Sequence, residues 1–229
     1  MNKKVIKRRK IKRKAILISF IFILLISLSI YYLYNIKITN IYIIDNEILS
    51  DYEIIKIAKL QDYPNSMDNS STKIKKRLES NEFIKSAKVV KKELFTEVYI
   101  YVEENIPLFY YQLINKVILK DGKKANGNYL IPVVTNEISP EVYDEFIDCM
   151  GLLNKDILIR ISEIKYDPND IDNERFYLTM NDGNYVYLTL NKFDKINNYL
   201  EIVKTFNNKK GILYLDSGEY FEIFDENIQ

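Results

Sequence analysis

Histidine and tryptophan are absent from this 229-residue sequence, and there is one cysteine, Cys149. Without histidine the chain lacks the most frequent general base and zinc ligand, and Ser-His or Cys-His nucleophile pairs are excluded. One cysteine cannot form an intramolecular disulfide, so any part outside the cell must fold without covalent cross-links. Only six glycines occur, and none forms a glycine-rich phosphate loop.

Positive charge is concentrated at the N-terminus. Nine of the 33 basic residues lie within positions 1–14, which contain no acidic residue. The rest of the chain therefore has 24 basic residues against 32 acidic ones, a net charge of −8. Because binding to nucleic acid requires a basic surface, we expect no nucleic-acid partner.

An uncharged run follows at 15–34, and we predict that it is a single transmembrane helix. Twenty helical residues span about 30 Å, the thickness of the hydrocarbon core of a bilayer. The basic flank predicts that 1–14 is a cytoplasmic segment, with the rest of the chain on the outer side. The alternative is a cleaved signal peptide, because Ser27-Leu28-Ser29 resembles a cleavage site. The apolar run continues past this site, which favours an uncleaved anchor.

The pattern at 38–107 predicts a small module of strands and helices. Ser50 and Glu53 have the spacing of a capping box at the start of a helix. β-branched and aromatic residues mark the strands. In chain order we predict a strand at 38–44, a helix after Ser50 that buries Ile54, Ile57 and Ala58, a helix at 72–80, and strands at 87–91 and 98–102.

The pattern at 108–224 predicts a second, mixed domain. Asp121-Gly122 is a strong tight-turn signal after a strand. The other predicted elements are a helix at 140–153, a strand from 161, a hairpin of 176–180 with 185–190, a helix at 193–206 with Phe193, Ile196, Leu200, Val203 and Phe206 inward, and final strands at 212–215 and 219–224. Cys149 lies on the apolar face of the helix at 140–153, so we expect a buried small hydrophobe rather than a reactive thiol.

These motifs, in this order, resemble the FtsQ/DivIB-type cell-division family. The resemblance is carried by Ile41–Asn46, Asn81–Val89, Val98–Pro107, Val117–Gly122, Leu130–Val134 and Asp216-Ser217-Gly218. Two departures are visible: Asp45 stands where the family has glycine, and Asn105-Ile106 stands where Arg-x is usual. The implied fold is α+β: a transmembrane helix, a POTRA-like β-α-α-β-β domain at 38–107, a mixed "β domain" at 108–224 with an open C-terminal edge strand, and a short tail at 225–229.

The resemblance also implies a function. It is that of a non-enzymatic divisome scaffold without cofactor or metal, in the cell membrane at the division septum, with its domains extracytoplasmic. Implied partners are FtsL-like and FtsB/DivIC-like single-pass coiled-coil proteins, with septal peptidoglycan synthases as further partners. The family's partner strand adds beside the last strand. This implicates Asp216, Ser217 and Gly218 by motif, and Tyr214, Leu215, Tyr220 and Phe221 by position.

Alternative interpretations remain open from the residues alone. The seven implicated residues can instead complete the core or form a turn or bulge. The first module can bind the cell wall directly, which would make the protein a membrane-anchored wall-binding module. A wall hydrolase would need two carboxylates, for which Glu103, Glu104 and Glu163 are candidates, although charged residues at strand ends are usually solvated.

Overall fold

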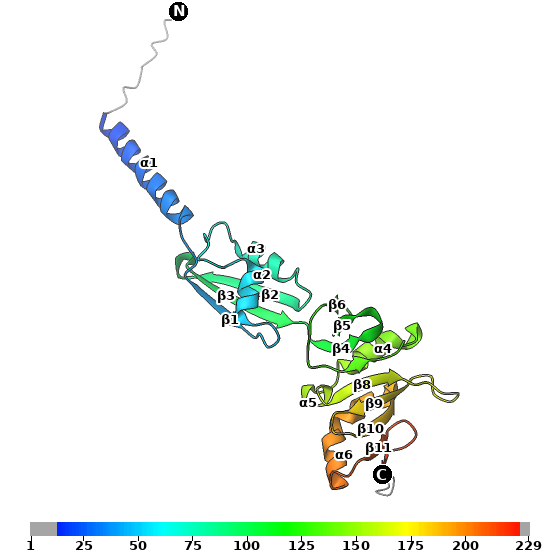
Figure 1. Ribbon diagram of the computed structural model, residues 1–229. Helices are drawn as coiled ribbons and strands as arrows, with labels where there is room; N and C mark the ends of the chain where they lie inside the picture. The colour runs from blue at the N-terminus through cyan, green and yellow to red at the C-terminus, as the bar shows by residue number, and fades with distance from the viewer. Residues whose placement is uncertain (1–12, 225–229) are drawn as a thin grey trace, which may run out of the picture. The chain divides into compact units, whose positions relative to one another are not determined.

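The computed structural model describes residues 13–224, which form two compact units (Figure 1). The first contains the described residues up to Asn81 together with Ser86–Glu103. The second contains Glu82–Lys85 and the described residues from Glu104 onward. The predicted domain boundary at 107/108 lies just after this division. The predicted basic segment, up to residue 12, and the predicted tail at 225–229 lie outside the described residues.

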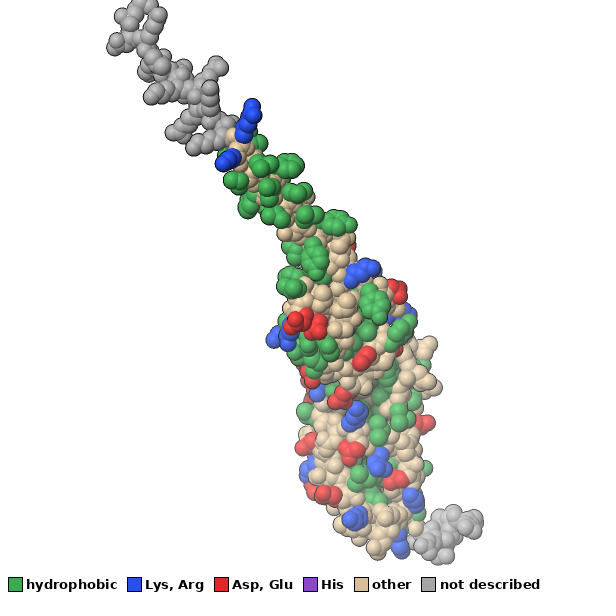
Figure 2. Space-filling model, turned by 90° about the vertical axis from the view of Figure 1, so that its left-hand side faces the viewer, with side chains coloured by type: hydrophobic (Ala, Val, Ile, Leu, Met, Phe, Trp, Pro, Cys, Tyr) green, Lys and Arg blue, Asp and Glu red, His purple; other side chains and the backbone are tan. Residues whose placement is uncertain are grey.

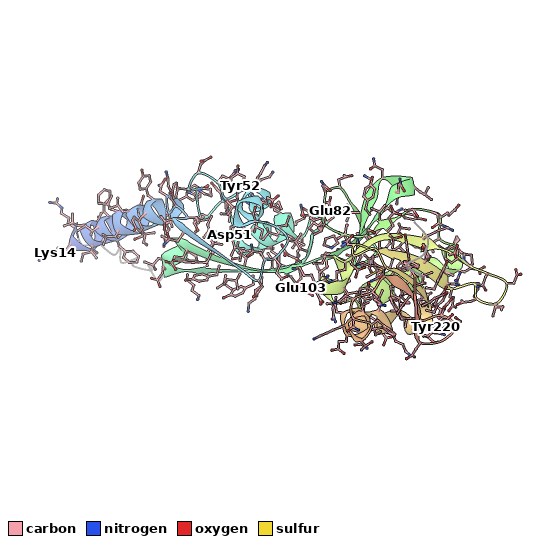
Figure 3. The ribbon with its side chains drawn as sticks, turned by 60° about the horizontal axis from the view of Figure 1, so that its bottom comes forward. Lys14, Asp51, Tyr52, Glu82, Glu103 and Tyr220 are labelled. Atoms are coloured by element: carbon pink, nitrogen blue, oxygen red, sulfur yellow. The ribbon has the colours of Figure 1, made fainter. Side chains whose placement is uncertain are left out.

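The N-terminal helix α1 (Arg13–Tyr34) matches the predicted anchor. Within residues 13–224 it is the one helix that is long and apolar enough to cross a membrane, with a mean hydropathy of 2.6. None of its residues is buried against the rest of the chain. Figure 2 shows its apolar side chains exposed along its length, and Figure 3 shows Lys14 at its N-terminal end. Such a helix requires an apolar environment, which a bilayer supplies.

The first unit has the predicted order of strand, helix, helix, strand, strand. Its sheet has the strand order β1-β3-β2, with β1 parallel to β3. Helices and β3 bury apolar residues on one side of this sheet, among them Ile54, Ile74 and Ile100. The elements are β1 (Asn40–Ile44), α2 (Asp51–Ala58), α3 (Ser71–Leu78), β2 (Ile84–Lys92), the 3-10 turn η1 (Glu93–Phe95) and β3 (Glu97–Glu104).

Two local features of the first unit are the capping box at Ser50 and the conformation of Asp45. The capping box is confirmed: the Glu53 N–H donates to Ser50 Oγ, and the Ser50 N–H donates to Glu53 Oε2 at 2.9 Å. Hydrogen bonds from Ser50 also lower the pKa of the Glu53 carboxyl. Asp45, which replaces the family's glycine, has φ of +69°. This left-handed conformation is the one that glycine adopts without cost and that aspartate tolerates better than most residues.

The second unit is built on a nine-stranded sheet with the order β12-β11-β10-β9-β8-β7-β4-β5-β6. Buried Asn105 links Glu82 and Phe83 to this unit through its side chain and its N–H, which explains why a short upstream segment belongs there. The elements are β4 (Pro107–Tyr111), η2 (Gln112–Ile114), β5 (Lys116–Leu119), β6 (Lys124–Ala125), β7 (Val133–Val134), α4 (Pro140–Met150), α5 (Lys155–Leu158), β8 (Ile161–Tyr166), β9 (Arg175–Met180), β10 (Tyr185–Thr189), η3 (Leu190–Asn198), α6 (Tyr199–Thr205), β11 (Gly211–Tyr214) and β12 (Tyr220–Ile223).

The two faces of this sheet differ because strand side chains alternate. On the covered face, buried residues of β9, β10 and β11 pack with the helices α4, η3 and α6. At the centre Phe146 stacks on Phe176 with ring centroids 4.6 Å apart, and Phe193 meets both rings edge-on. The opposite face carries partly exposed tyrosines, among them Tyr177, Tyr187 and Tyr214, which alternate with the buried residues. The covered face therefore holds the core of the unit.

The last predicted helix required a correction. Residues 190–198 form the 3-10 helix η3, and an α-helix begins only at Tyr199. A 3-10 helix has three residues per turn, so Leu190, Phe193, Ile196 and Tyr199 fall on one buried line. The assumption of 3.6 residues per turn placed Leu200 inward, and this was wrong, because Leu200 is exposed.

Smaller corrections concern element ends. The predicted strand at 38–44 begins at Asn40, although Ile38 is buried and its N–H donates to the Pro64 carbonyl at 3.0 Å. The helix predicted to reach 153 ends at Met150, before Gly151. Within the family-like segment at 130–134, Val133–Val134 form the short strand β7, and the Tyr110 N–H donates to the Pro132 carbonyl at 2.8 Å.

Cys149 behaves as expected for an apolar packing residue. It is half-buried, packs against the core and lies 3.5 Å from the Leu190 carbonyl. Burial, with nearby acidic residues, raises the pKa of its thiol to about 11. A thiol that stays protonated at neutral pH is a poor nucleophile.

A buried polar network attaches the terminal hairpin to the sheet. The Asn184 amide donates to Tyr199 Oη at 2.8 Å and accepts from the Gly211 N–H, where β11 begins, at 2.9 Å. Tyr199 donates in turn to Asp182 at 2.8 Å. Asn184 and Tyr199 are fully buried, so each polar atom here depends on its partner.

We predict that Asn184→Ala lowers the free energy of unfolding of the second unit by about 2–3 kcal/mol, because it leaves buried donors and acceptors without partners. Urea denaturation followed by tyrosine fluorescence measures this. Asn126→Ala, which removes an exposed asparagine of the same unit, is the control and should change stability by less than about 0.5 kcal/mol. Equal effects of the two substitutions would contradict the structural role of Asn184.

Candidate functional site

The C-terminal edge of the nine-stranded sheet is formed by β12. β11 pairs in parallel with β10 and antiparallel with β12, through the register Gly211↔Ile223 to Tyr214↔Tyr220. Among residues 13–224, β12 has β11 on one side in the strand order and no strand on the other. The predicted open edge strand is therefore present in the fold.

The register shows which backbone groups of β12 are free. The Phe224 N–H donates to the Lys210 carbonyl at 2.9 Å, so this pair is hydrogen-bonded. Hydrogen-bonded and non-hydrogen-bonded pairs alternate in an antiparallel ladder. Tyr220 and Glu222 therefore direct their backbone groups toward β11, whereas Phe221 and Ile223 direct theirs to the unpaired side.

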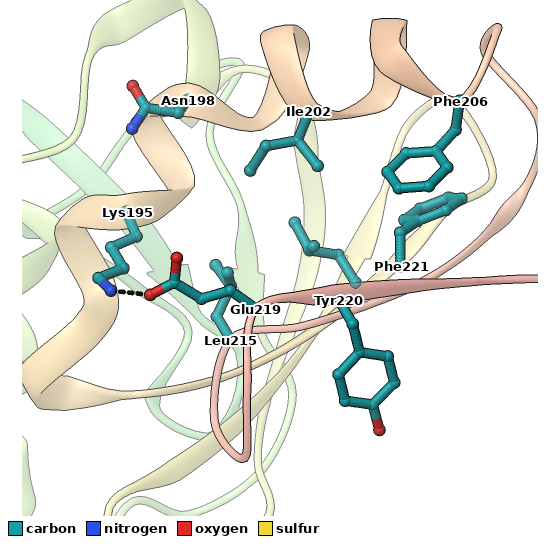
Figure 4. A pocket seen from close by; sticks show the side chains of 9 residues that line it. Lys195, Asn198, Ile202, Phe206, Leu215, Glu219, Tyr220 and Phe221 are labelled. Atoms are coloured by element: carbon teal, nitrogen blue, oxygen red, sulfur yellow. Dashed lines mark hydrogen bonds and ion pairs between the residues drawn. The ribbon is translucent and has the colours of Figure 1, made fainter.

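A groove of about 300 Å³ lies between β12 and the helical segments η3 and α6 (Figure 4). Its apolar floor includes Ile202 and a pair of stacked rings, Phe206 and Phe221, whose centroids are 4.8 Å apart. An ion pair between Lys195 and Glu219 closes one end and lowers the pKa of the Glu219 carboxyl. The full lining is Lys195, Asn198, Ile202, Phe206, Leu213, Leu215, Glu219, Tyr220 and Phe221.

On the other face of the sheet, a tyrosine ladder (Tyr177, Tyr187, Tyr214, Tyr220) crosses from β9 to the edge. Successive ring centroids are 4.7, 5.5 and 4.7 Å apart. Burial, with the neighbouring tyrosines, raises the pKa of Tyr177 to about 12. The ladder ends at Tyr220, which is 51% exposed. A side chain on an added strand would extend this ladder.

An ionic brace holds the loop between β11 and β12. Arg175 Nε lies 2.8 Å from Asp216 Oδ2, and Arg175 Nη1 lies 2.8 Å from Asp167 Oδ2. The guanidinium also covers the Tyr187 ring at 3.8 Å. Burial alone would raise the pKa of the Asp216 carboxyl, but hydrogen bonds from Arg175 and Ser217 outweigh burial and lower this pKa.

The structure divides the seven implicated residues into different environments. Leu215 is buried in the core, and its N–H donates to the Tyr187 carbonyl at 2.7 Å. Asp216 belongs to the ionic brace, and Ser217 donates to it through its N–H. Gly218 begins the approach to β12, where an added Cβ would lie 3.1 Å from the Tyr220 ring. Tyr214, Tyr220 and Phe221 lie on the last two strands, with Tyr220 exposed and Phe221 facing the groove.

Sequence reasoning did not assign six of the groove residues to the site: Lys195, Asn198, Ile202, Phe206, Leu213 and Glu219. The alignment of those on the helical segment depends on the change from 3-10 to α geometry at Tyr199. The free backbone of Ile223 was also missed, because it follows from the pairing register and not from its side chain.

The carboxylates considered for hydrolysis are divided between the two units. Glu103 belongs to the first unit and accepts from Ser86 at 2.9 Å, whereas Glu104 and Glu163 belong to the second. Across residues 13–224, no group of three or more His, Cys, Asp or Glu side chains is placed to hold a metal ion.

Comparison with known proteins shows similarity to cell-division proteins. Residues 36–105 match the model for the POTRA domain, FtsQ-type. The chain is 28% identical to the cell division protein DivIB of Bacillus subtilis, over 98% of this chain and 89% of that protein. It is 29% identical to DivIB of Listeria monocytogenes, over 97% of this chain and 86% of that protein.

A solved structure is also similar in part. It is the major extracytoplasmic domain of DivIB from Geobacillus stearothermophilus, with 23% identity and a TM-score of 0.38, covering 46% of this chain and 97% of that one. This score is too low to support a conclusion about the fold or the site.

We predict that Asp216→Asn lowers the free energy of unfolding at pH 7 by about 1–2 kcal/mol, because Arg175 loses a charged partner that is only 10% exposed. The folded-state pKa of Asp216 is depressed, so its contribution is complete above the unfolded-state pKa of about 4 and is lost as the pH falls below it. The variant should therefore lose less stability than the parent between pH 5 and pH 2 (roughly the range over which a carboxyl titrates). Urea denaturation at each pH measures this, with exposed Asp170→Asn as control; parallel curves for parent and D216N would refute it.

Proposed function

We propose that this chain, a homologue of the DivIB cell-division proteins that contains an FtsQ-type POTRA domain, acts in cell division as a membrane-anchored scaffold without enzymatic activity. The observation that carries this proposal is the unpaired strand β12 beside an apolar groove. An unpaired strand offers backbone N–H and C=O groups that an extended segment of another protein can pair with.

The proposed partners are FtsL-like and FtsB/DivIC-like proteins, which the resemblance to the family implies. An added strand alternates its side chains between the two faces of the sheet. On one face these side chains would enter the groove floored by Ile202, Phe206 and Phe221. On the other they would meet Tyr220 at the end of the ladder. Specificity would thus come from an apolar residue and an aromatic one at successive positions, and affinity from the backbone pairs.

The proposed location is the cell membrane at the division septum, with both units extracytoplasmic. The apolar helix α1 supports membrane anchoring. The basic residues at its N-terminal end favour a cytoplasmic N-terminus, because positively charged flanks are retained inside. From this position the scaffold would influence septal peptidoglycan synthases through the partners that it binds.

Backbone pairing with a partner can be tested without changing the hydrogen bonds between β11 and β12. We predict that Ile223→Pro weakens binding of an FtsB/DivIC-like partner at least about tenfold, because proline removes an N–H on the free side of β12. Proline is tolerated on an edge strand whose N–H faces solvent, so the sheet should remain folded. Ile223→Ala, which keeps the N–H, is the matched control. Co-purification of the detergent-solubilised chain with candidate partners measures the effect.

Two outcomes of that experiment would count against strand addition. Equal loss of binding in the proline and alanine variants would assign the effect to the side chain. Retention of the parent chain by purified cell wall, without retention by any candidate partner, would favour a wall-binding module instead.

The exposed end of the ladder gives a second test. We predict that Tyr220→Lys reduces partner binding roughly tenfold, because it removes a stacking surface and places a charge where the added strand would lie. Tyr52→Lys replaces a similarly exposed tyrosine in the first unit, which Figure 3 shows on α2. Binding by the Tyr52 variant should match the parent. Undiminished co-purification of the Tyr220 variant would exclude Tyr220 from the binding surface.

A further inference from the structure

The segment that joins α1 to β1 is short and hydrogen-bonded to two loops. The Ile38 N–H donates to the Pro64 carbonyl at 3.0 Å, and the Ser66 N–H donates to the Ile36 carbonyl at 2.8 Å. Nearer to the helix, the Asn65 side chain donates to the Tyr34 carbonyl. On the other side, the Thr39 N–H donates to the Thr96 carbonyl at 2.8 Å.

These bonds fix the distance of both loops from the end of the apolar helix. A chain extends at most about 3.5 Å per residue, so Ile38 lies within roughly 14 Å of Tyr34. The loop containing Pro64 and the β2–β3 turn are paired with residues in this interval. Figure 1 shows the turn beside the connection between α1 and β1. If α1 crosses a membrane, these bonds keep both loops near the end of α1 at which it leaves the bilayer.

Four large apolar side chains project from these two loops, and we name them the proximal tip. Their exposed fractions are 66% for Tyr63, 45% for Met67, 78% for Leu94 and 45% for Phe95. Single exposed apolar residues are common on soluble proteins. A group of them beside the end of an apolar helix instead indicates a contact surface. Exposed to water, these side chains contribute no burial free energy to the fold.

The backbone at the tip adopts an unfavourable conformation at three of these four residues. Glu93, Leu94 and Phe95 are consecutive non-glycine residues with φ of +44°, +52° and +71°, and Tyr63 has φ of +51°. Bulky residues rarely adopt the left-handed region, because the side chain crowds the backbone. The turn is secured by the Ser66 hydroxyl, which donates to the Phe95 carbonyl at 2.7 Å.

We propose that the proximal tip contacts the lipid bilayer in which α1 is anchored, at the level of the headgroups. The aromatic and aliphatic side chains would enter the interface, where Tyr and Phe are stabilised. Deeper insertion is opposed by Glu93, by neighbouring Asp62 and by loop backbone, which hydrocarbon cannot solvate. Exposed Lys37 and Lys92 lie beside the tip and can meet anionic headgroups. The first unit would then have a second attachment to the membrane besides its covalent one.

The chain contains no tryptophan, so a single introduced tryptophan reports on one position. The full chain is reconstituted in phosphatidylcholine/phosphatidylglycerol nanodiscs as the variants Leu94→Trp, Tyr63→Trp and Tyr52→Trp. Tyr52 is the matched control, since its 64% exposure nearly equals that of Tyr63. Tyr52 is the second residue of α2, which follows β1, and β1 runs from Asn40, near the anchor, away from it to Ile44. Quenching by lipids brominated on the upper acyl chain is then measured.

We expect quenching at the Leu94 and Tyr63 positions to exceed quenching at the Tyr52 position at least twofold, with blue-shifted emission at both. Far-ultraviolet circular dichroism of each variant checks that the fold is retained. Quenching no stronger at the tip than at Tyr52 would overturn the proposal. So would a blue shift without lipid quenching, because a protein surface, such as a second copy of this chain, would then cover the tip.

Discussion

The unpaired backbone of β12 is the feature around which the second unit is arranged. A sheet that does not close must end in two edges, and proteins protect such edges against unwanted pairing. At one end the sheet finishes in β6, only two residues long and carrying exposed Lys124, which is a protected edge. At the other end β12 has four residues, with exposed Tyr220 and Ile223. This difference between the two edges supports the proposal that β12, and not β6, pairs with another chain.

An available edge recognises a partner well only if its surroundings are already in place. Ordering an interface on binding costs free energy, so a preformed surface binds more tightly. Here the loop before β12 is braced by Asp216 and Arg175, and the start of β11 is fixed by Asn184. The groove is shaped from behind by Phe206 stacked on Phe221. Leu215, which is buried and lines the groove, and Asp216, which holds the loop, thus support the edge mainly from within.

Much of the fold could be predicted from the sequence because its signals are local. The uncharged run of α1, the Ser50–Glu53 capping box and the Asp121-Gly122 turn each depend on residues within a few positions of one another. The candidate site depends on relations that are not local. Arg175 and Asp216 are 41 positions apart. Phe193, Ile196 and Tyr199 lie on one buried line because residues 190–198 form a 3-10 helix with three residues per turn. The sequence prediction assumed 3.6 residues per turn throughout this segment.

The parallel pairing of β10 with β11 explains why the free groups of the edge strand were not foreseen. Its register places Val186 opposite Leu213, and the register of β12 then follows from Leu213 opposite Phe221. Only this chain of pairings shows that Ile223, and not Glu222, presents its backbone outward. The side-chain pattern of a strand shows which face of the sheet each residue occupies. The direction of the residue's backbone hydrogen bonds follows only from its pairing with neighbouring strands.

A four-residue edge offers few backbone hydrogen bonds, and each contributes only about 1 kcal/mol net. Such a strand alone would bind a partner weakly from solution. Partners that cross the same membrane are confined with the chain in a thin layer, which raises their effective concentration without any new contact. The helix α1, and with it the proposed contact of the proximal tip, would restrict the chain to that layer. A short edge strand therefore suits a chain whose partners share its membrane better than it would suit a free protein.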